Sequence, residues 1–159
     1  SAVRDGMRLI SVVMGTKSDE ARAQESQKLL NYGFRYYQTY KIYQANDSLN
    51  ESKVWYGTEE SVNLGISEDL YVTIPRGNDH KKRLNATMNI TPIIEAPIEI
   101  NHNLGQLVLK LDDELIAERP LVALNVVEEA GFFARFIDAI KLFFFKLSII
   151  IPPFLIWVF

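Results

Sequence analysis

The chain of 159 residues contains no cysteine and only two histidines, His80 and His102. The absence of cysteine excludes a disulfide framework, a thiolate metal site and a cysteine nucleophile. His80 lies in a polar loop and His102 lies between two asparagines, and neither spacing is typical of a metal site. We therefore interpret both histidines as solvated loop residues and expect no cofactor.

A surplus of positive charge is also absent. The net charge is −3, so we expect no nucleic acid partner for the chain as a whole. The first six residues are short and polar and do not resemble a signal peptide. Apolar sequence typical of a strand already begins at residue 7, which favours the interpretation that the chain is a fragment of a longer protein.

The first 40 residues predict one strand and one helix. Residues 7–15 form a nearly continuous apolar run, typical of a strand buried on both faces and closed by Gly15. Ser18 is a candidate N-cap, and the helix should run to about Tyr32 with Gly33 as its C′ residue. One strand and one helix cannot enclose a core. They are therefore a remnant of a larger α/β layer or, alternatively, pack into the domain that follows.

Between residues 41 and 128 apolar and polar residues alternate, as in short strands with one buried face. The expected strands cover residues 52–56, 69–75, 83–91, 105–111, 114–118 and 120–127. Short strands separated by turn signals predict a small antiparallel β-sandwich. The predicted fold class is therefore mainly β, with a strand and helix before the sandwich and an amphipathic helix after it.

Residues 129–147 predict that amphipathic helix. At helical spacing, one arc collects bulky apolar residues: Phe132, Phe133, Phe136, Ile137, Ile140, Phe143, Phe144 and Leu147. The opposite arc carries Arg135, Asp138, Lys141 and Lys146, with Leu142 and Phe145 as its only apolar members. A wide apolar face opposite a narrow basic face suits the boundary between water and lipid. We predict a membrane anchor here, with packing against a protein core as the alternative.

The last segment, residues 148–159, carries no charge and is almost wholly apolar. Counted from Leu142, the apolar run is 18 residues long, which is near the lower limit for a spanning helix. Lys146 and the pair Pro152-Pro153 disfavour a regular span, because proline interrupts helical hydrogen bonding. We expect an interfacial anchor rather than a spanning helix, and we assign no role to the tail itself.

Basic residues also gather in one loop, formed by Arg76, Lys81, Lys82 and Arg83. The loop is a candidate site for an anionic partner, and a solvated loop is the alternative. The carboxylates of residues 112–114 are interpreted as a hairpin turn, where aspartate tolerates the required backbone angles.

Six segments in order carry a resemblance to a known family: 8–15 (RLISVVMG), 21–30 (ARAQESQKLL), 33–37 (GFRYY), 54–57 (VWYG), 70–77 (LYVTIPRG) and 118–122 (ERPLV). From residue 1 to about 147 the chain resembles the C-terminal half of the low-molecular-mass penicillin-binding proteins, the D-alanyl-D-alanine carboxypeptidases of the penicillin-binding protein 5/6 type. The resemblance implies that residues 1–40 end the serine peptidase domain and that residues 41–128 form a β-rich second domain. It also implies that residues 129–147 hold the enzyme on the periplasmic face of the bacterial inner membrane, with lipid as the partner.

That family attacks the D-Ala-D-Ala bond of the peptidoglycan stem peptide with a serine, and it requires S-x-x-K, S-x-N and K-T-G motifs. No serine here has lysine three residues later, K-T-G is absent, and Ser48-Leu49-Asn50 matches S-x-N only by chance. We therefore assign no catalytic residue, and we expect the chain alone to be an inactive spacer and anchor that meets the stem peptide through a missing catalytic domain. The alternative is an independent β-sandwich module that binds a cell-wall or protein partner at the membrane surface.

Overall fold

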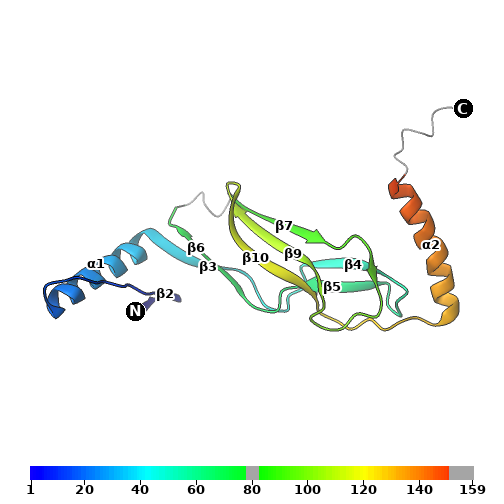
Figure 1. Cartoon of the computed structure of the whole chain (residues 1–159), viewed down its shortest axis with the longest axis horizontal. Helices are drawn as coiled ribbons and strands as arrows, with labels where there is room; N and C mark the ends of the chain where they lie inside the picture. The colour runs from blue at the N-terminus through cyan, green and yellow to red at the C-terminus, as the bar shows by residue number, and fades with distance from the viewer. Residues whose placement is uncertain (78–82, 151–159) are drawn as a thin grey trace, which may run out of the picture. The chain divides into compact units, whose positions relative to one another are not determined.

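The computed structural model describes residues 1–77 and 83–150, and Figure 1 shows its elements. In chain order they are β1 (Ala2–Arg4), β2 (Met7–Leu9), α1 (Asp19–Tyr36), β3 (Tyr37–Tyr43), β4 (Asn50–Trp55), β5 (Ser61–Gly65), β6 (Leu70–Pro75), β7 (Leu84–Ile90), β8 (Ile94–Glu95), β9 (Asn103–Leu111), β10 (Glu114–Ala123) and α2 (Phe132–Ile150). The prediction of a mainly β chain with a helix after the last strand is confirmed.

The strands form a six-stranded sheet and two smaller sheets. The order in the large sheet is β7-β9-β10-β5-β4-β8, and the two-stranded sheets are β1-β2 and β3-β6. Strands β4 and β5 pair antiparallel, whereas β4 and β8 pair parallel.

The chain divides into two compact units. The first comprises Ser1–Gln44, Asp69–Thr87 and Val108–Glu118, and the second comprises Ala45–Glu68, Met88–Leu107 and Arg119–Phe159. The domain limits expected from the sequence, at residues 40 and 128, stay predictions.

Helix α1 begins as the sequence predicts, but it ends later. The Ser18 hydroxyl accepts a hydrogen bond from the Ala21 N–H at 3.2 Å, which confirms Ser18 as the N-cap. Hydrogen bonds from the Glu20 backbone and from Ser18 hold the pKa of the Glu20 carboxyl below its ordinary value, so this carboxylate stays charged where the helix dipole favours an anion.

Gly33 is not the C′ residue of α1, because the helix continues to Tyr36. A Cβ atom at Gly33 would lie 2.5 Å from Leu9 Cδ1 of β2. The glycine therefore permits close packing of β2 on the helix. The prediction that Gly33 ends the helix was wrong.

The single strand expected over residues 7–15 is also wrong. Strand β2 ends at Leu9 and pairs with β1, while Ile10, Val12 and Met14 are 72, 76 and 86% exposed. A strand that is apolar on both faces needs neighbours and covering layers on both faces. The described part of the chain supplies β1 as its partner, and the apolar run beyond Leu9 stays exposed.

The core of the second unit lies between strands of the large sheet and the segments that follow them. Its buried members are Val54, Val62, Leu64, Ile94, Ile98, Leu104, Ala123 and Val127. Strand β10 is continuous where the sequence predicted two strands separated before Pro120. The pairing of β10 with β5 involves Val122 and Ala123, so Pro120 lies outside that ladder and its missing N–H is tolerated there.

Candidate functional site

Helix α2 packs on the second unit through one side. The Tyr56 N–H donates a hydrogen bond to Asp138 Oδ2 at 3.1 Å, Leu142 is only 2% exposed, and the Phe145 ring lies 5.7 Å from the Trp55 ring between centroids. Residues 138, 142 and 145 are spaced by four and three, so they lie on one face of the helix. These three contacts fix the rotation of α2 about its axis.

The opposite side of α2 is an exposed apolar face. We define this aromatic face as the described members of the predicted arc: Phe132, Phe133, Phe136, Ile137, Ile140, Phe143 and Phe144. These side chains are between 46 and 83% exposed. Leu147, the eighth predicted member, belongs to α2, but its side chain lies outside the described residues.

The exposed aromatic face of α2 is typical of a contact surface. Single exposed hydrophobic residues are normal on a soluble protein, but contiguous apolar surface marks a contact with a partner or a membrane. Here seven large side chains lie within residues 132–144 of one helix. No helix within residues 1–77 and 83–150 is both long and apolar enough to cross a membrane. The seven exposed side chains make this side of α2 a candidate contact surface.

The basic residues of α2 are partly paired. Arg135 Nη1 lies 2.9 Å from Glu129 Oε2, and Lys141 Nζ lies 3.6 Å from Asp138 Oδ1. Lys146 is exposed. The sequence analysis described a basic face on the helix but did not predict the ion pair of Arg135 with Glu129, which precedes the helix. This pair neutralises one of the basic residues of that face.

The basic loop is described only at its ends. Arg76 Nε donates a hydrogen bond to the Tyr37 carbonyl at 3.1 Å, and Arg83 forms an ion pair with Asp112. Lys81 and Lys82 lie outside the described residues, as does His80. Binding of an anionic partner by this loop stays a prediction, while both described arginines serve contacts within the first unit.

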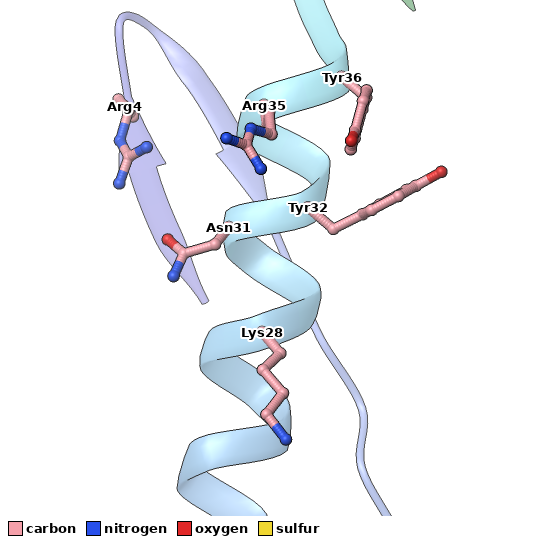
Figure 2. A pocket seen from close by; sticks show the side chains of 6 residues that line it. All are labelled: Arg4, Lys28, Asn31, Tyr32, Arg35 and Tyr36. Carbon is pink, nitrogen blue, oxygen red and sulfur yellow. The ribbon is translucent and has the colours of Figure 1, made fainter.

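The sequence reasoning missed a cavity of about 610 Å³ in the first unit, and Figure 2 shows the six side chains that line it. It is lined by Arg4 from β1 and by Lys28, Asn31, Tyr32, Arg35 and Tyr36 from α1. The helical lining residues recur every three or four positions and so share one face of α1. This spacing was the feature of the sequence from which the shared face could have been predicted. Lys28 pairs with Glu25 at 2.7 Å, and the Arg4 guanidinium lies 4.7 Å from the Phe34 ring centroid.

The chain matches the family model described as "Penicillin-binding protein 5, C-terminal domain" over residues 37–129. It is 38% identical over 144 residues to the D-alanyl-D-alanine carboxypeptidase DacA of Escherichia coli K12, and this match covers 91% of the chain and 36% of the relative. It is 40% identical over 145 residues to DacC of the same organism, with the same coverage. The chain thus spans about a third of the length of these relatives.

The chain is also similar to solved structures of penicillin-binding protein 5 and of a D-alanyl-D-alanine carboxypeptidase. Penicillin-binding protein 5 from Haemophilus influenzae matches with a TM-score of 0.68 and 34% identity, over 74% of this chain and 34% of that one. The D-alanyl-D-alanine carboxypeptidase DacD from Francisella tularensis matches with a TM-score of 0.56 and 32% identity, over 81% of this chain and 32% of that one.

Proposed function

Because this chain belongs to the penicillin-binding protein 5 C-terminal domain family, we propose that it is the C-terminal portion of a serine-type D-Ala-D-Ala carboxypeptidase. In this proposal the whole enzyme trims the peptidoglycan stem peptide. The β-strands of this chain act as a spacer, and α2 attaches the enzyme to the periplasmic face of the bacterial inner membrane.

The exposed aromatic face of α2 carries the proposal of attachment. Burying apolar surface yields about 25 cal/mol per Å², and a helix with this face gains that energy in the lipid interface while its backbone stays hydrogen-bonded. On the opposite side Leu142 is buried and the Phe145 ring lies against Trp55 of β4. The aromatic face is therefore the side of α2 that is available for lipid.

The exposed apolar run after β2 supports a second part of the proposal. Ile10, Val12 and Met14 alternate along residues that the sequence predicts as a buried strand. A run of this kind is an aggregation hazard unless other strands cover it. We propose that residues 1–40 complete the serine peptidase domain of the whole enzyme, which covers this run, and that residues 41–128 form the spacer.

The absent catalytic motifs predict that the chain alone does not react with penicillin. Family chemistry needs the serine of S-x-x-K as the acylated nucleophile, and no serine of this chain stands in that motif. We expect no covalent label after incubation with a fluorescent penicillin and denaturing electrophoresis, with an intact DacA-type carboxypeptidase as the positive control. A labelled band that survives denaturation would contradict the assignment of catalysis to another part of the enzyme.

Membrane attachment predicts that removal of residues 130–159, which include α2 and the apolar tail, abolishes binding to vesicles. The full chain should float with phospholipid vesicles in a density gradient, while a chain that ends at Glu129 should stay at the bottom. Circular dichroism of the shortened chain checks that the β-strands still fold. If both chains float equally, α2 is not the attachment site.

A further inference from the structure

The cavity of about 610 Å³ in the first unit has a positively charged wall. Among the described residues, its lining contains two arginines and one lysine but no carboxylate. The lysine, Lys28, is paired with Glu25, which lies 2.7 Å away. The two guanidinium groups, of Arg4 and Arg35, therefore determine the charge of the cavity, and they favour an anion as its ligand.

Neither arginine has an acidic partner in the described part of the chain. The ion pairs and side-chain hydrogen bonds of residues 1–77 and 83–150 include neither the Arg4 nor the Arg35 guanidinium group. An arginine presents five N–H donors in a planar fork that matches the oxygens of carboxylate and phosphate groups. These donors are therefore available to a ligand.

Helix α1 and the β1–β2 hairpin bring the two arginines to one groove. The Arg4 guanidinium lies 4.7 Å from the centroid of the Phe34 ring, and Phe34 directly precedes Arg35 in the helix. Asn31 lies four residues before Arg35, so the two side chains are neighbours on the helix surface. Figure 2 shows both guanidinium groups and the Asn31 amide on the side of α1 where the hairpin lies. One anion in this groove can accept hydrogen bonds from both elements.

Packing beneath the groove holds its two walls in place. Met7, which pairs with Arg4 in the β1–β2 register, is 5% exposed, and so is Phe34. Leu9 lies against Gly33, where a Cβ atom would be only 2.5 Å from Leu9 Cδ1. Because the hairpin packs closely on the helix at these residues, the backbone positions of both arginines are fixed. Binding then costs less conformational freedom than it would between two mobile segments.

A phosphate monoester fits this groove better than a carboxylate. Its phosphate carries a charge of about −1.5 to −2 at neutral pH and three acceptor oxygens, which can meet two guanidinium groups and one amide. A carboxylate has one charge and two oxygens, so one guanidinium group saturates it. The negative end of the α1 dipole, about half a charge, lies near Arg35. It weakens the attraction but does not reverse it, because the two arginines supply two positive charges.

The cavity has room for the organic part of such a monoester. Its volume of about 610 Å³ is within the range of small-molecule sites. The rings of Tyr32 and Tyr36 form its aromatic part, with centroids 4.6 Å apart. No aliphatic residue of the described chain lines it, in contrast to the exposed apolar run at Ile10, Val12 and Met14. That run is typical of a surface that protein covers, whereas the polar cavity suits solvent and a soluble ligand.

We infer that this cavity binds the phosphate group of a soluble phosphate monoester through Arg4, Asn31 and Arg35, an inference that does not rest on the attachment proposed for α2. Titration of the full chain with phenyl phosphate, followed by the ¹H–¹⁵N resonances of the Asn31 side-chain amide, measures binding at the groove. Inorganic phosphate should compete with phenyl phosphate. Benzoate, which has the same ring and a carboxylate, should bind at least about tenfold more weakly, since it pairs with one guanidinium group.

Methyl phenyl phosphate separates a soluble monoester from the phosphate of a membrane lipid. It is a diester with a single charge, like the phosphate of most phospholipids. It should also bind at least about tenfold more weakly than phenyl phosphate, because one charge and one terminal oxygen are lost. Tighter binding of the diester would overturn the choice of a monoester.

Two variants test whether the arginines carry the binding. Arg4→Gln and Arg35→Gln each remove one positive charge and should weaken binding of phenyl phosphate at least about tenfold, because charge-assisted hydrogen bonds are lost. Arg22→Gln is the matched control. Arg22 is also on α1, but it pairs with Asp19 at 3.3 Å and does not line the cavity, so the affinity of this variant should stay within about twofold. Circular dichroism checks that each variant is folded.

The outcomes separate this inference from the proposed function. Unchanged Asn31 resonances, or equal affinity for phenyl phosphate and benzoate, would overturn the phosphate site. Similar losses in Arg22→Gln and Arg35→Gln would also overturn it, by assigning the effect to net charge. Binding by this chain but not by the whole enzyme would show that another part of the enzyme supplies the anion. That result would overturn the ligand site and leave the proposed function intact.

Discussion

Replacement of Phe133 and Phe136 with serine is expected to weaken vesicle binding by at least about 100-fold, because two aromatic side chains would no longer enter the lipid. Full burial of a phenylalanine side chain contributes about 1.5–3 kcal/mol, and each 1.4 kcal/mol is about tenfold in affinity. In the free chain both side chains are largely exposed, so the substitutions remove little internal packing besides the edge-on contact of the Phe132 and Phe133 rings. Titration with phosphatidylcholine vesicles, followed by sedimentation, measures the change.

A matched control for these variants is Tyr71→Ser. Tyr71 is an aromatic residue exposed on β6 in the first unit, outside α2, so its loss should leave vesicle affinity within about twofold. Circular dichroism of all three proteins checks that each is folded, because Tyr71→Ser also removes a hydrogen bond to Asp69 and the contact of its ring with Lys41. Unchanged affinity in the double variant would show that another surface binds the lipid.

Leu64→Ala is expected to reduce the free energy of unfolding by about 2–5 kcal/mol, the cost typical of a leucine truncated inside a core. Leu64 is 0% exposed and belongs to the core cluster of the second unit. The strands around it pair through backbone hydrogen bonds and cannot close the cavity easily. A loss of this size is a large share of the stability of an ordinary domain.

Urea unfolding followed by fluorescence measures this loss. Trp55 is buried in the same unit, and Trp157→Phe makes it the only tryptophan. Leu115→Ala, at a residue 55% exposed on β10, is the matched control and should change stability by less than about 0.5 kcal/mol. Similar losses in the two variants would show that Leu64 does not lie in the core.

The sequence predicted the faces of α2 but not which face meets protein. Its periodicity separated the aromatic arc from Leu142 and Phe145, which stood out as apolar residues on a polar side. The structure shows that these two residues, with Asp138, dock α2 on the strands. Periodicity reports only the angular position of a residue on a helix. The docking partners Tyr56 and Trp55 lie some 80 residues earlier in the chain, beyond the reach of a local pattern.

The prediction of the strands was limited in the same way, because a local pattern does not show which distant segments pack together. Residues 70–75 alternate between apolar and polar side chains, and the structure has β6 there with alternating burial. Strand β5 was missed, because Ser61–Gly65 is short and its burial is decided by neighbours in the sheet. The contact of α2 with β4 was missed for the same reason, because only the fold brings the Trp55 and Phe145 rings together.

The docking of α2 has a mechanical consequence. A helix joined to its domain by a flexible linker could roll on a membrane while the domain turned freely. Here the hydrogen bond to Asp138, the burial of Leu142 and the Trp55–Phe145 ring contact oppose rolling of the helix against β4. In the proposed attachment, in which the aromatic face enters the lipid, β4 would be held at a fixed angle to the membrane plane. Helix α2 would then orient the second unit as well as attach it.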